Sequence, residues 1–397
     1  MHQVITPDFY DYAWFPPSAV RIEGDFIRVR WPDGAELQGY VAWLLENAIG
    51  TGIDPATREG LIDPADLDPD TRLVGAEIAD DGAVVVTFDR PPESVAFHPG
   101  WLHHVAVGAH HPASWLPTPE PWVPATLPEP PTHDGPRVLA DAAGLGGFLD
   151  DLVRWGLARL RGLPRQPDVA RQLAELIGPT RWTNFGDVWD VRADVALAGA
   201  ADTNSTANTR LRLGPHTDLP TRETPPGFQF LHCLVNETEG GSSTMADGLA
   251  VVRALELEHP EHYEALTTLR WVFFNRGPGL DHRWSAPLID LGPPGSPVTL
   301  RAFYPVRGFP DMGPEDMPRA YRALTVFSRL AAADRFQLRF SLEPGDLVAF
   351  DNRRILHGRD AFDSGGRRHL RGLYLDHDEV LSATRVAARR RAATTHS

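Results

Sequence analysis

Apolar and polar residues alternate along much of residues 20–105, a pattern that is typical of strands with one buried face. The run RIEGDFIRVRWPDG alternates and then breaks at a Pro-Asp-Gly turn. The run AEIADDGAVVVTF predicts two strands joined at an Asp-Gly turn. Residues 1–110 are therefore predicted to form a small β-rich domain.

A proline-rich stretch follows this first domain. Residues 112–136, PASWLPTPEPWVPATLPEPPTHDGP, contain nine prolines. Because proline fixes φ and lacks an N–H donor, this stretch cannot form a regular helix or a central strand. We interpret residues 111–136 as an extended linker and residues 137–397 as a second domain.

The second domain begins with helical spacing of apolar residues and continues with short apolar runs. Helices are predicted in GGFLDDLVRWGLARL, DVARQLAELIG and PEDMPRAYRALTVFSRLAAA. Strands are predicted in GFQFLHCLV, LRWVFF, VTLRAFYP, QLRFSLEPGDLVAFD and HLRGLYLD, which Gly, Pro and Asp turns separate. This order favours a mainly β fold with flanking helices, either a β-sandwich or a jelly-roll barrel.

Composition narrows the class of protein. The chain has 53 acidic and 38 basic residues and a net charge of −15, which argues against binding to nucleic acid. The basic stretch RVAARRRAATTHS is interpreted as a solvated helix end with a tail. Its single cysteine, Cys233, permits neither an intrachain disulfide nor a cysteine-based zinc site.

Two kinds of segment that would direct the chain elsewhere are missing from the sequence. No stretch approaches the roughly 18 apolar residues of a membrane helix. The N-terminal residues MHQVITPDFYDYAWFPP lack the basic region and apolar run of a signal peptide. We expect a soluble, cytoplasmic protein that does not bind membranes.

The segment GPHTDLPTR places His216 two positions before Asp218. On an extended segment, residues i and i+2 point to the same face, so the two side chains can face one cation. A His-x-Asp pair occurs often by chance, and a polar loop without a metal is the alternative interpretation.

Two later segments supply groups that complete such a site. His357 follows an apolar strand in EPGDLVAFDNRRILHGRDAF, and Arg368 lies in GGRRHLRGLY. Two histidines and one carboxylate leave open positions on an iron, and a guanidinium can hold a carboxylate by two hydrogen bonds. Taken singly, His357 could cap a strand end and Arg368 could be an exposed strand residue. Their order and spacing together favour an iron site with a carboxylate co-substrate.

The chain resembles the γ-butyrobetaine hydroxylase and trimethyllysine hydroxylase branch of the Fe(II)- and 2-oxoglutarate-dependent oxygenases, which is related to taurine dioxygenase. The resemblance rests on HTDLPTRETPPGFQFLHCLVNETEGGSSTMADG, LEPGDLVAFDNRRILHGRDAF and RRHLRGLYLDHDEVLS, with ELIGPTRWTNFGDVWDV before them. It implies a double-stranded β-helix core in which His216, Asp218 and His357 hold Fe(II). It also implies that Arg368, assisted by Ser243, holds the distal carboxylate of 2-oxoglutarate. Oxygen is the other co-substrate, and a homodimer is expected.

The N-terminal domain departs from this family. Its relatives carry a zinc ion held by three cysteines and a histidine, but the matching segment YVAWLLENAIGTGIDPATREGLIDPADL contains no cysteine. We expect no zinc, so apolar packing must hold this domain together. The histidine-rich run HHVAVGAHH, residues 103–111, is interpreted as a strand whose adjacent histidines face opposite sides and form no replacement site.

The substrate pocket departs from the family as well. Relatives enclose a trimethylammonium group in aromatic rings, whose faces attract the cation. The matching positions here are Phe185, Trp189, Asn208 and Tyr374, and Asn208 stands where the family has tyrosine. Losing one ring weakens the cage, so we expect a substrate other than γ-butyrobetaine. The alternative is that the three aromatic residues are ordinary core residues.

These observations predict an enzyme that hydroxylates or otherwise oxidises an unactivated C–H bond of a small molecule. It would convert 2-oxoglutarate and oxygen to succinate and carbon dioxide. One alternative is a true γ-butyrobetaine or trimethyllysine hydroxylase with a remodelled cage. Another is a non-catalytic relative that serves as a binding module.

Overall fold

A computed structural model describes residues 4–192, 211–275, 279–293, 296–302, 307–362 and 366–395. The chain divides into two compact units, Met1–Ser114 and Trp115–Ser397. Each unit has its own apolar core. Among the described residues, no helix combines the length and the apolar character that crossing a membrane would require.

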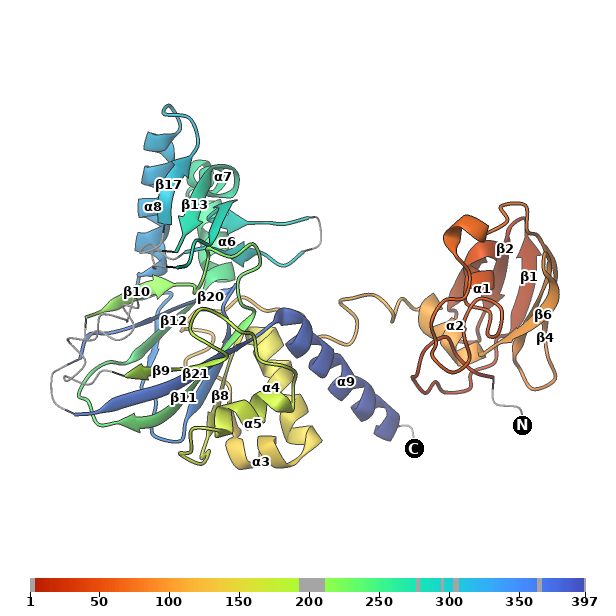
Figure 1. Cartoon of the computed structure of the whole chain (residues 1–397), viewed down its shortest axis with the longest axis horizontal. Coiled ribbons are helices and arrows are strands. Elements are labelled where there is room, and N and C mark those ends of the chain that lie inside the picture. The colour runs from red at the N-terminus through yellow and green to blue at the C-terminus, as the bar shows by residue number, and fades with distance from the viewer. Residues whose placement is uncertain are drawn as a thin grey trace. The chain divides into compact units, whose positions relative to one another are not determined.

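The first unit contains two three-stranded antiparallel sheets, with strand orders β1-β2-β3 and β4-β5-β6 (Figure 1). Their strands are β1 (Ala19–Glu23), β2 (Phe26–Arg30), β3 (Glu36–Tyr40), β4 (Leu73–Ile78), β5 (Val84–Asp89) and β6 (Pro92–Phe97). The helices of this unit are α1 (Val41–Glu46), η1 (Pro64–Asp66) and α2 (Pro99–Ala106). Alternate residues of β2 and β5, such as Ile27, Val29, Val84 and Val86, are fully buried. The two strands predicted in AEIADDGAVVVTF are therefore confirmed, whereas the alternating run RIEGDFIRVR is divided at Gly24 into β1 and β2.

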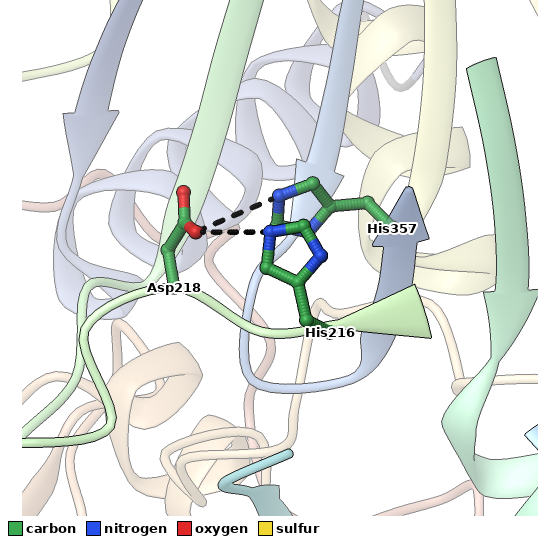
Figure 2. Close-up of side chains that lie close together, drawn as sticks. All are labelled: His216, Asp218 and His357. Carbon is green, nitrogen blue, oxygen red and sulfur yellow. Dashed lines mark ion pairs between the residues drawn. The ribbon is translucent and has the colours of Figure 1, made fainter. Parts of the chain in front are cut away.

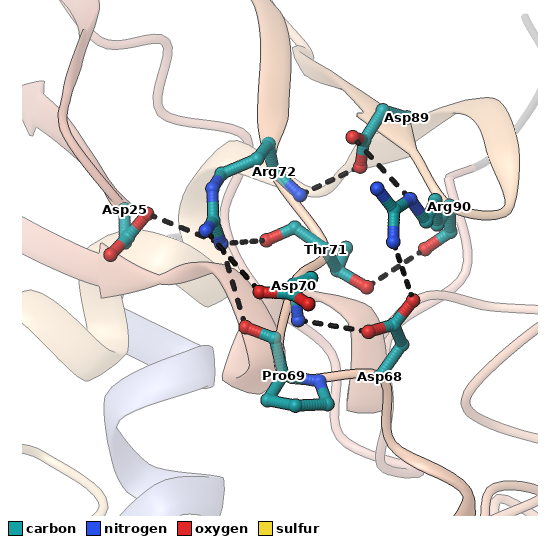
Figure 3. Close-up of polar contacts among 8 residues, drawn as sticks. All are labelled: Asp25, Asp68, Pro69, Asp70, Thr71, Arg72, Asp89 and Arg90. Carbon is teal, nitrogen blue, oxygen red and sulfur yellow. Dashed lines mark hydrogen bonds and ion pairs between the residues drawn. The ribbon is translucent and has the colours of Figure 1, made fainter.

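Polar contacts join the segment before β4 to the end of β5 (Figure 3). The main-chain N–H of Arg72 donates to Asp89 Oδ1 at 2.7 Å, and Thr71 donates to the carbonyl of Arg90 at 3.1 Å. Arg90 in turn lies 3.1 Å from Asp68. A main-chain N–H from Asp70, together with Arg90, lowers the pKa of Asp68. Because these side chains are exposed, water screens the ion pairs, and the hydrogen bonds mainly define the loop.

The interpretation of residues 103–111 as a strand was wrong. His103 and His104 lie in helix α2, which begins at Pro99, and proline is favoured at the first helical position. His98 caps this helix by accepting hydrogen bonds from the next free N–H groups. His103 lies 2.8 Å from Asp33. The cap at His98 and the proline at position 99 thus start a helix here, although the apolar pattern of the sequence suggested a strand.

Most of the predicted linker packs against the second unit. Trp122 is buried; its main-chain N–H donates to Asp247 at 2.9 Å and its indole N–H donates to the carbonyl of Trp155 at 2.7 Å. Strand β7 (Thr132–Asp134) pairs with β8 (Leu157–Arg161) at the edge of a sheet. The prolines exclude regular structure over most of the stretch, but the extended chain is held by side-chain contacts.

Two sheets form the centre of the second unit (Figure 1). The larger has the order β7-β8-β19-β11-β21-β9 and the smaller the order β10-β20-β12-β18. Their further strands are β9 (Val188–Arg192), β10 (Leu213–His216), β11 (Phe228–Asn236), β12 (Ser243–Asp247), β18 (Leu338–Phe340), β19 (Leu347–Asp351), β20 (Ile355–Arg359) and β21 (Arg368–Leu375). Residues of both sheets, such as Phe350 and Leu370 from the larger and Met245 and Ile355 from the smaller, share one apolar cluster. This arrangement is consistent with the double-stranded β-helix.

Helices cover both sheets, so the unit is mixed rather than mainly β. The helices α3 (Gly135–Ala140), α4 (Ala142–Trp155), α5 (Val169–Glu175) and α9 (His377–Thr395) contribute to the cluster on the larger sheet or pack beside it. The helices α6 (Gly248–Glu258), α7 (Pro260–Thr268) and α8 (Met317–Ala331) cover the smaller sheet together with β13 (Arg270–Phe274), β14 (Arg283–Pro287), β15 (Ile289–Asp290), β16 (Thr299–Leu300) and β17 (Arg307–Asp311).

One predicted helix is divided in two elements. Helix α4 ends at Gly156, whose φ of 68° lies in the left-handed region that favours glycine. The residues that follow form strand β8 instead of another helical turn. The prediction of helix across GGFLDDLVRWGLARL was therefore wrong after Trp155.

A buried ion pair ties the helices to the smaller sheet. Arg354 donates to both oxygens of Asp247 at 2.9 and 2.8 Å, and both side chains are almost fully buried. Asp247 also accepts a hydrogen bond from the N–H of Leu249 and so caps helix α6. Arg354 donates further to the carbonyls of Arg154 and Glu120.

We predict that Asp247→Ala destabilises the second unit by about 3–5 kcal/mol, because it leaves the charge of Arg354 buried without its partner. Urea unfolding followed by circular dichroism would measure the free energy of unfolding. Glu258→Ala, which breaks an exposed pair with Arg335, is the control and should have little effect. Equal effects of the two substitutions would contradict the role given to burial.

Candidate metal centre

The pairing of two strands brings two histidines together. His216 ends β10 and lies directly opposite His357 of β20 in the antiparallel register. Their ring centroids are 4.0 Å apart, and both side chains are buried. Residues directly opposite in a sheet point to the same face, so both imidazoles enter one space (Figure 2).

Asp218 completes this group from the loop that follows β10. Its Oδ1 lies 3.4 Å from Nε2 of His216 and 3.7 Å from Nε2 of His357. One ligand atom from each of the three residues lies within 4.8 Å of the others (Figure 2). The three predicted ligands therefore converge, as a metal bound by two imidazoles and one carboxylate requires.

Hydrogen bonding leaves the correct nitrogen of His216 available. Its Nδ1 lies 2.9 Å from the carbonyl oxygen of Gly214, a contact that an N–H group satisfies. The lone pair then lies on Nε2, the atom that faces Asp218. A hydrogen bond from the ring nitrogen that does not bind the metal usually orients a metal-binding imidazole.

The protonation states of the group suit a cation. Burial lowers the pKa of His357 to about 3, so this imidazole is neutral at pH 7. Burial by itself would raise the pKa of Asp218, but the neighbouring imidazoles of His357 and His216 and the hydrogen bond from the Tyr374 hydroxyl hold it well below its usual range. Metal ligands must be deprotonated, and both groups meet this condition.

The side chain of Asn352 holds the loop that carries Asp218. The N–H of Asp218 donates to Asn352 Oδ1 at 2.7 Å, and Asn352 Nδ2 donates back to the carbonyl of Asp218 at 3.0 Å. The same amide donates to the carbonyl of Pro226, and Asn352 is fully buried. Because Asn352 lies between β19 and β20, it joins the loop of Asp218 to the strand of His357.

Arg301 holds the same loop from another side. It is 2% exposed, and its guanidinium donates to the main-chain carbonyls of Pro220, Arg222 and Glu223. Burial lowers its pKa to about 10, so it stays charged at pH 7. Neither Asn352 nor Arg301 was expected at the site from the sequence. Each follows an apolar run in the sequence, which is a sign that the position is buried, but polar residues are usually expected to be exposed.

Arg368 and Ser243 lie at the starts of β21 and β12. Arg368 is 4% exposed, burial lowers its pKa, and its Nε has no hydrogen-bond partner among the described residues. Arg359 lies directly opposite Ser243 in the sheet, and both arginines lie over the ring of Phe362, at 4.6 Å for Arg359 and 5.8 Å for Arg368. Two buried guanidinium groups in one place favour an anionic ligand. Arg359 was not predicted.

Three of the four predicted substrate residues are described, and they form an aromatic series. Trp189 stacks on Tyr374 with ring centroids 4.2 Å apart, and Phe185 lies 6.4 Å from Trp189. The Tyr374 hydroxyl donates to Asp218 Oδ2 at 2.7 Å, which places this series beside the metal ligands. Burial and the charge of Asp218 raise the pKa of Tyr374 well above 10. Asn208 lies outside the described residues.

The fold and this site define a class, the non-haem Fe(II)- and 2-oxoglutarate-dependent dioxygenases. Residues 120–374 match the family described as taurine catabolism dioxygenase TauD, TfdA family, and the chain belongs to it. Dependence on Fe(II), 2-oxoglutarate and oxygen follows from this membership and from the ligand group.

Relatives extend the match beyond the catalytic unit. γ-Butyrobetaine dioxygenase of Pseudomonas sp. strain AK-1 is 38% identical over 395 residues, covering 96% of this chain and 99% of the relative. Human γ-butyrobetaine dioxygenase is 31% identical over 66% of this chain and 67% of its own length. Bovine mitochondrial trimethyllysine dioxygenase is 29% identical over 64% of this chain and 60% of its own length. The solved structure of PvcB from Pseudomonas aeruginosa has a TM-score of 0.46 at 23% identity, and the match covers 62% of this chain and 83% of PvcB.

We predict that His216→Ala or Asp218→Ala abolishes Fe(II) binding and succinate formation while the chain stays folded, because each removes one of three ligands. Anaerobic titration calorimetry would measure binding, and circular dichroism would check folding. His110→Ala, at an exposed histidine of the first unit, is the matched control. Retention of wild-type Fe(II) affinity by either ligand variant would refute the assignment.

Arg368→Met is predicted to raise the KM for 2-oxoglutarate about tenfold or more, since a charge-assisted hydrogen bond to the carboxylate is lost. The neighbouring Arg367→Met removes an exposed arginine that pairs with Glu237 and should leave this KM unchanged. Steady-state assays at saturating Fe(II) would compare them. An unchanged KM in Arg368→Met would show that another residue anchors the co-substrate.

Proposed function

We propose that this chain is an Fe(II)- and 2-oxoglutarate-dependent oxygenase that hydroxylates an unactivated C–H bond of a small molecule with a cationic group. The double-stranded β-helix of the second unit carries the site. The convergence of His216, Asp218 and His357 beside an aromatic wall is the observation that supports this function most strongly.

Bound ferrous iron would supply the oxidising chemistry, with 2-oxoglutarate and oxygen as co-substrates. His216 and His357 offer imidazole nitrogens, and Asp218 offers a negative charge that offsets part of the charge of the cation. Arg368, assisted by Ser243, would hold the distal carboxylate of 2-oxoglutarate and so orient the co-substrate. The proposed roles of these residues are binding and orientation, and orientation selects the bond that reacts.

The aromatic residues support a cationic substrate. The faces of Trp189 and Tyr374 attract a cation, and their stacking leaves little freedom for either ring. Phe185 is 40% exposed, which is more typical of a pocket entrance than of a core residue. Asn208, where relatives have tyrosine, removes one ring and adds an amide that forms hydrogen bonds. We therefore propose a substrate that is related to γ-butyrobetaine but more polar near Asn208.

γ-Butyrobetaine itself is the second candidate. The 38% identity to the Pseudomonas enzyme over nearly its full length favours this candidate, as does the retention of three aromatic positions. A homodimer, the absence of zinc and a cytoplasmic location all stay predictions.

We predict that Asn208→Tyr raises kcat/KM for γ-butyrobetaine about two- to thirtyfold, the effect of one regained cation–π contact. Succinate release and mass spectrometry of the product would measure the reaction. Asn204→Tyr, in the same segment, is the control for a general effect of a new ring. If the wild-type chain turns over γ-butyrobetaine efficiently and Asn208→Tyr adds nothing, the second candidate holds. Metal binding without turnover on any ammonium substrate would favour a binding module.

A further inference from the structure

The two carboxylate oxygens of Asp218 have different neighbours. Oδ1 faces Nε2 of His216 at 3.4 Å and Nε2 of His357 at 3.7 Å. Oδ2 accepts the hydrogen bond from the Tyr374 hydroxyl at 2.7 Å. One carboxylate oxygen of Asp218 thus faces the two imidazoles, and the other accepts a hydrogen bond from the phenol of Tyr374.

The phenol that makes this contact has little freedom to move. Tyr374 is 1% exposed and lies on β21, opposite Gln229 of the neighbouring strand β11. Its carbonyl accepts a hydrogen bond from the N–H of Arg181 at 2.8 Å. Its ring stacks on Trp189 of β9, the strand that pairs with the other edge of β21, so the hydroxyl is held in place by main chain and ring together.

A glycine makes room for that stack. Gly372 lies directly opposite Trp189 in the β21–β9 register, and a Cβ atom added there would lie 2.6 Å from the indole ring. Any larger residue would therefore displace Trp189 from its place against Tyr374. The absence of a side chain at Gly372 is part of what keeps the phenol beside Asp218.

The main chain of Asp218 is fixed as well. Asn352 binds both its N–H and its carbonyl, so rotation of the side chain is the freedom that is left. A single hydrogen bond to Oδ2 is enough to remove that freedom, because it sets the plane of the carboxylate.

We propose that Tyr374 is a positioning residue that makes Asp218 a ligand through Oδ1 alone. A carboxylate can bind a metal through one oxygen or both. Binding through both would take a coordination position that the co-substrate or oxygen needs, since this ligand set works by leaving positions open. This inference rests on the proposed assignment of His216, Asp218 and His357 as the ligands.

Tyr374 also joins two parts of the site. The ring of Tyr374 belongs to the wall against which the cationic group of the substrate is proposed to lie, whereas its hydroxyl contacts a metal ligand. A substrate that moved this ring would also move the hydrogen bond to Asp218. Tyr374 therefore has two separable roles, one of the ring face and one of the O–H group.

Tyr374→Phe separates these roles because it keeps the ring and removes the O–H. With the full-length chain and Co(II) as the probe, we expect the affinity for Co(II) to fall about ten- to hundredfold, as for other residues that orient metal ligands. We also expect the visible spectrum of bound Co(II) to change, since that spectrum reports the coordination geometry. Tyr321→Phe, at a tyrosine packed on Trp271 away from the site, is the matched control and should bind Co(II) as the wild-type chain does.

Wild-type affinity and an unchanged Co(II) spectrum in a folded Tyr374→Phe would overturn the inference. Asp218→Ala shows which idea has failed. If the ligand assignment is wrong, Asp218→Ala binds Co(II) normally; if only the role of Tyr374 is wrong, Asp218→Ala still loses Co(II) binding. If Tyr374→Phe does not fold, infrared difference spectra of the wild-type chain with and without Mn(II) provide the test. Carboxylate bands of one-oxygen binding support the proposal, and bands of two-oxygen binding overturn it.

Discussion

The register between β10 and β20 is the constraint on which the rest of the site depends. It places His216 directly opposite His357, although the two residues belong to distant parts of the chain. A shift of one residue would turn one imidazole to the other face of the sheet. The apolar clusters on the two faces of β20 hold this register, because Ile355 packs into the cluster between the sheets and Leu356 into the cluster with α6 and α8. Metal binding is thus a consequence of how the core packs.

The third ligand lies in a loop, and hydrogen bonds substitute there for a sheet. Buried main-chain groups need partners, and here polar side chains from distant segments supply them. Asn352 and Arg301 together hold the carbonyls of Asp218, Pro220, Arg222, Glu223 and Pro226. Satisfying these groups makes an irregular loop as well defined as a strand. A ligand site needs that support around it to keep its geometry.

Sequence reasoning found the parts of this site that have a local pattern. The hairpins of the first unit follow from alternation and turn residues, and His216, Asp218 and His357 follow from spacing and resemblance. The contacts of Asn352, Arg301 and Arg359 could not be found in this way, because each joins segments far apart in the chain. Two errors have local causes. A left-handed glycine ended a predicted helix at Gly156, and a proline after His98 began a helix where a strand was predicted.

The central claim is that one cation lies between His216, Asp218 and His357. Anomalous diffraction at the iron absorption edge, from crystals grown without oxygen in the presence of Fe(II) and 2-oxoglutarate, tests it most directly. The account predicts one strong iron peak in the second unit, within bonding distance of both Nε2 atoms and of Asp218 Oδ1. An iron peak held by other residues, or none at these three, would contradict it.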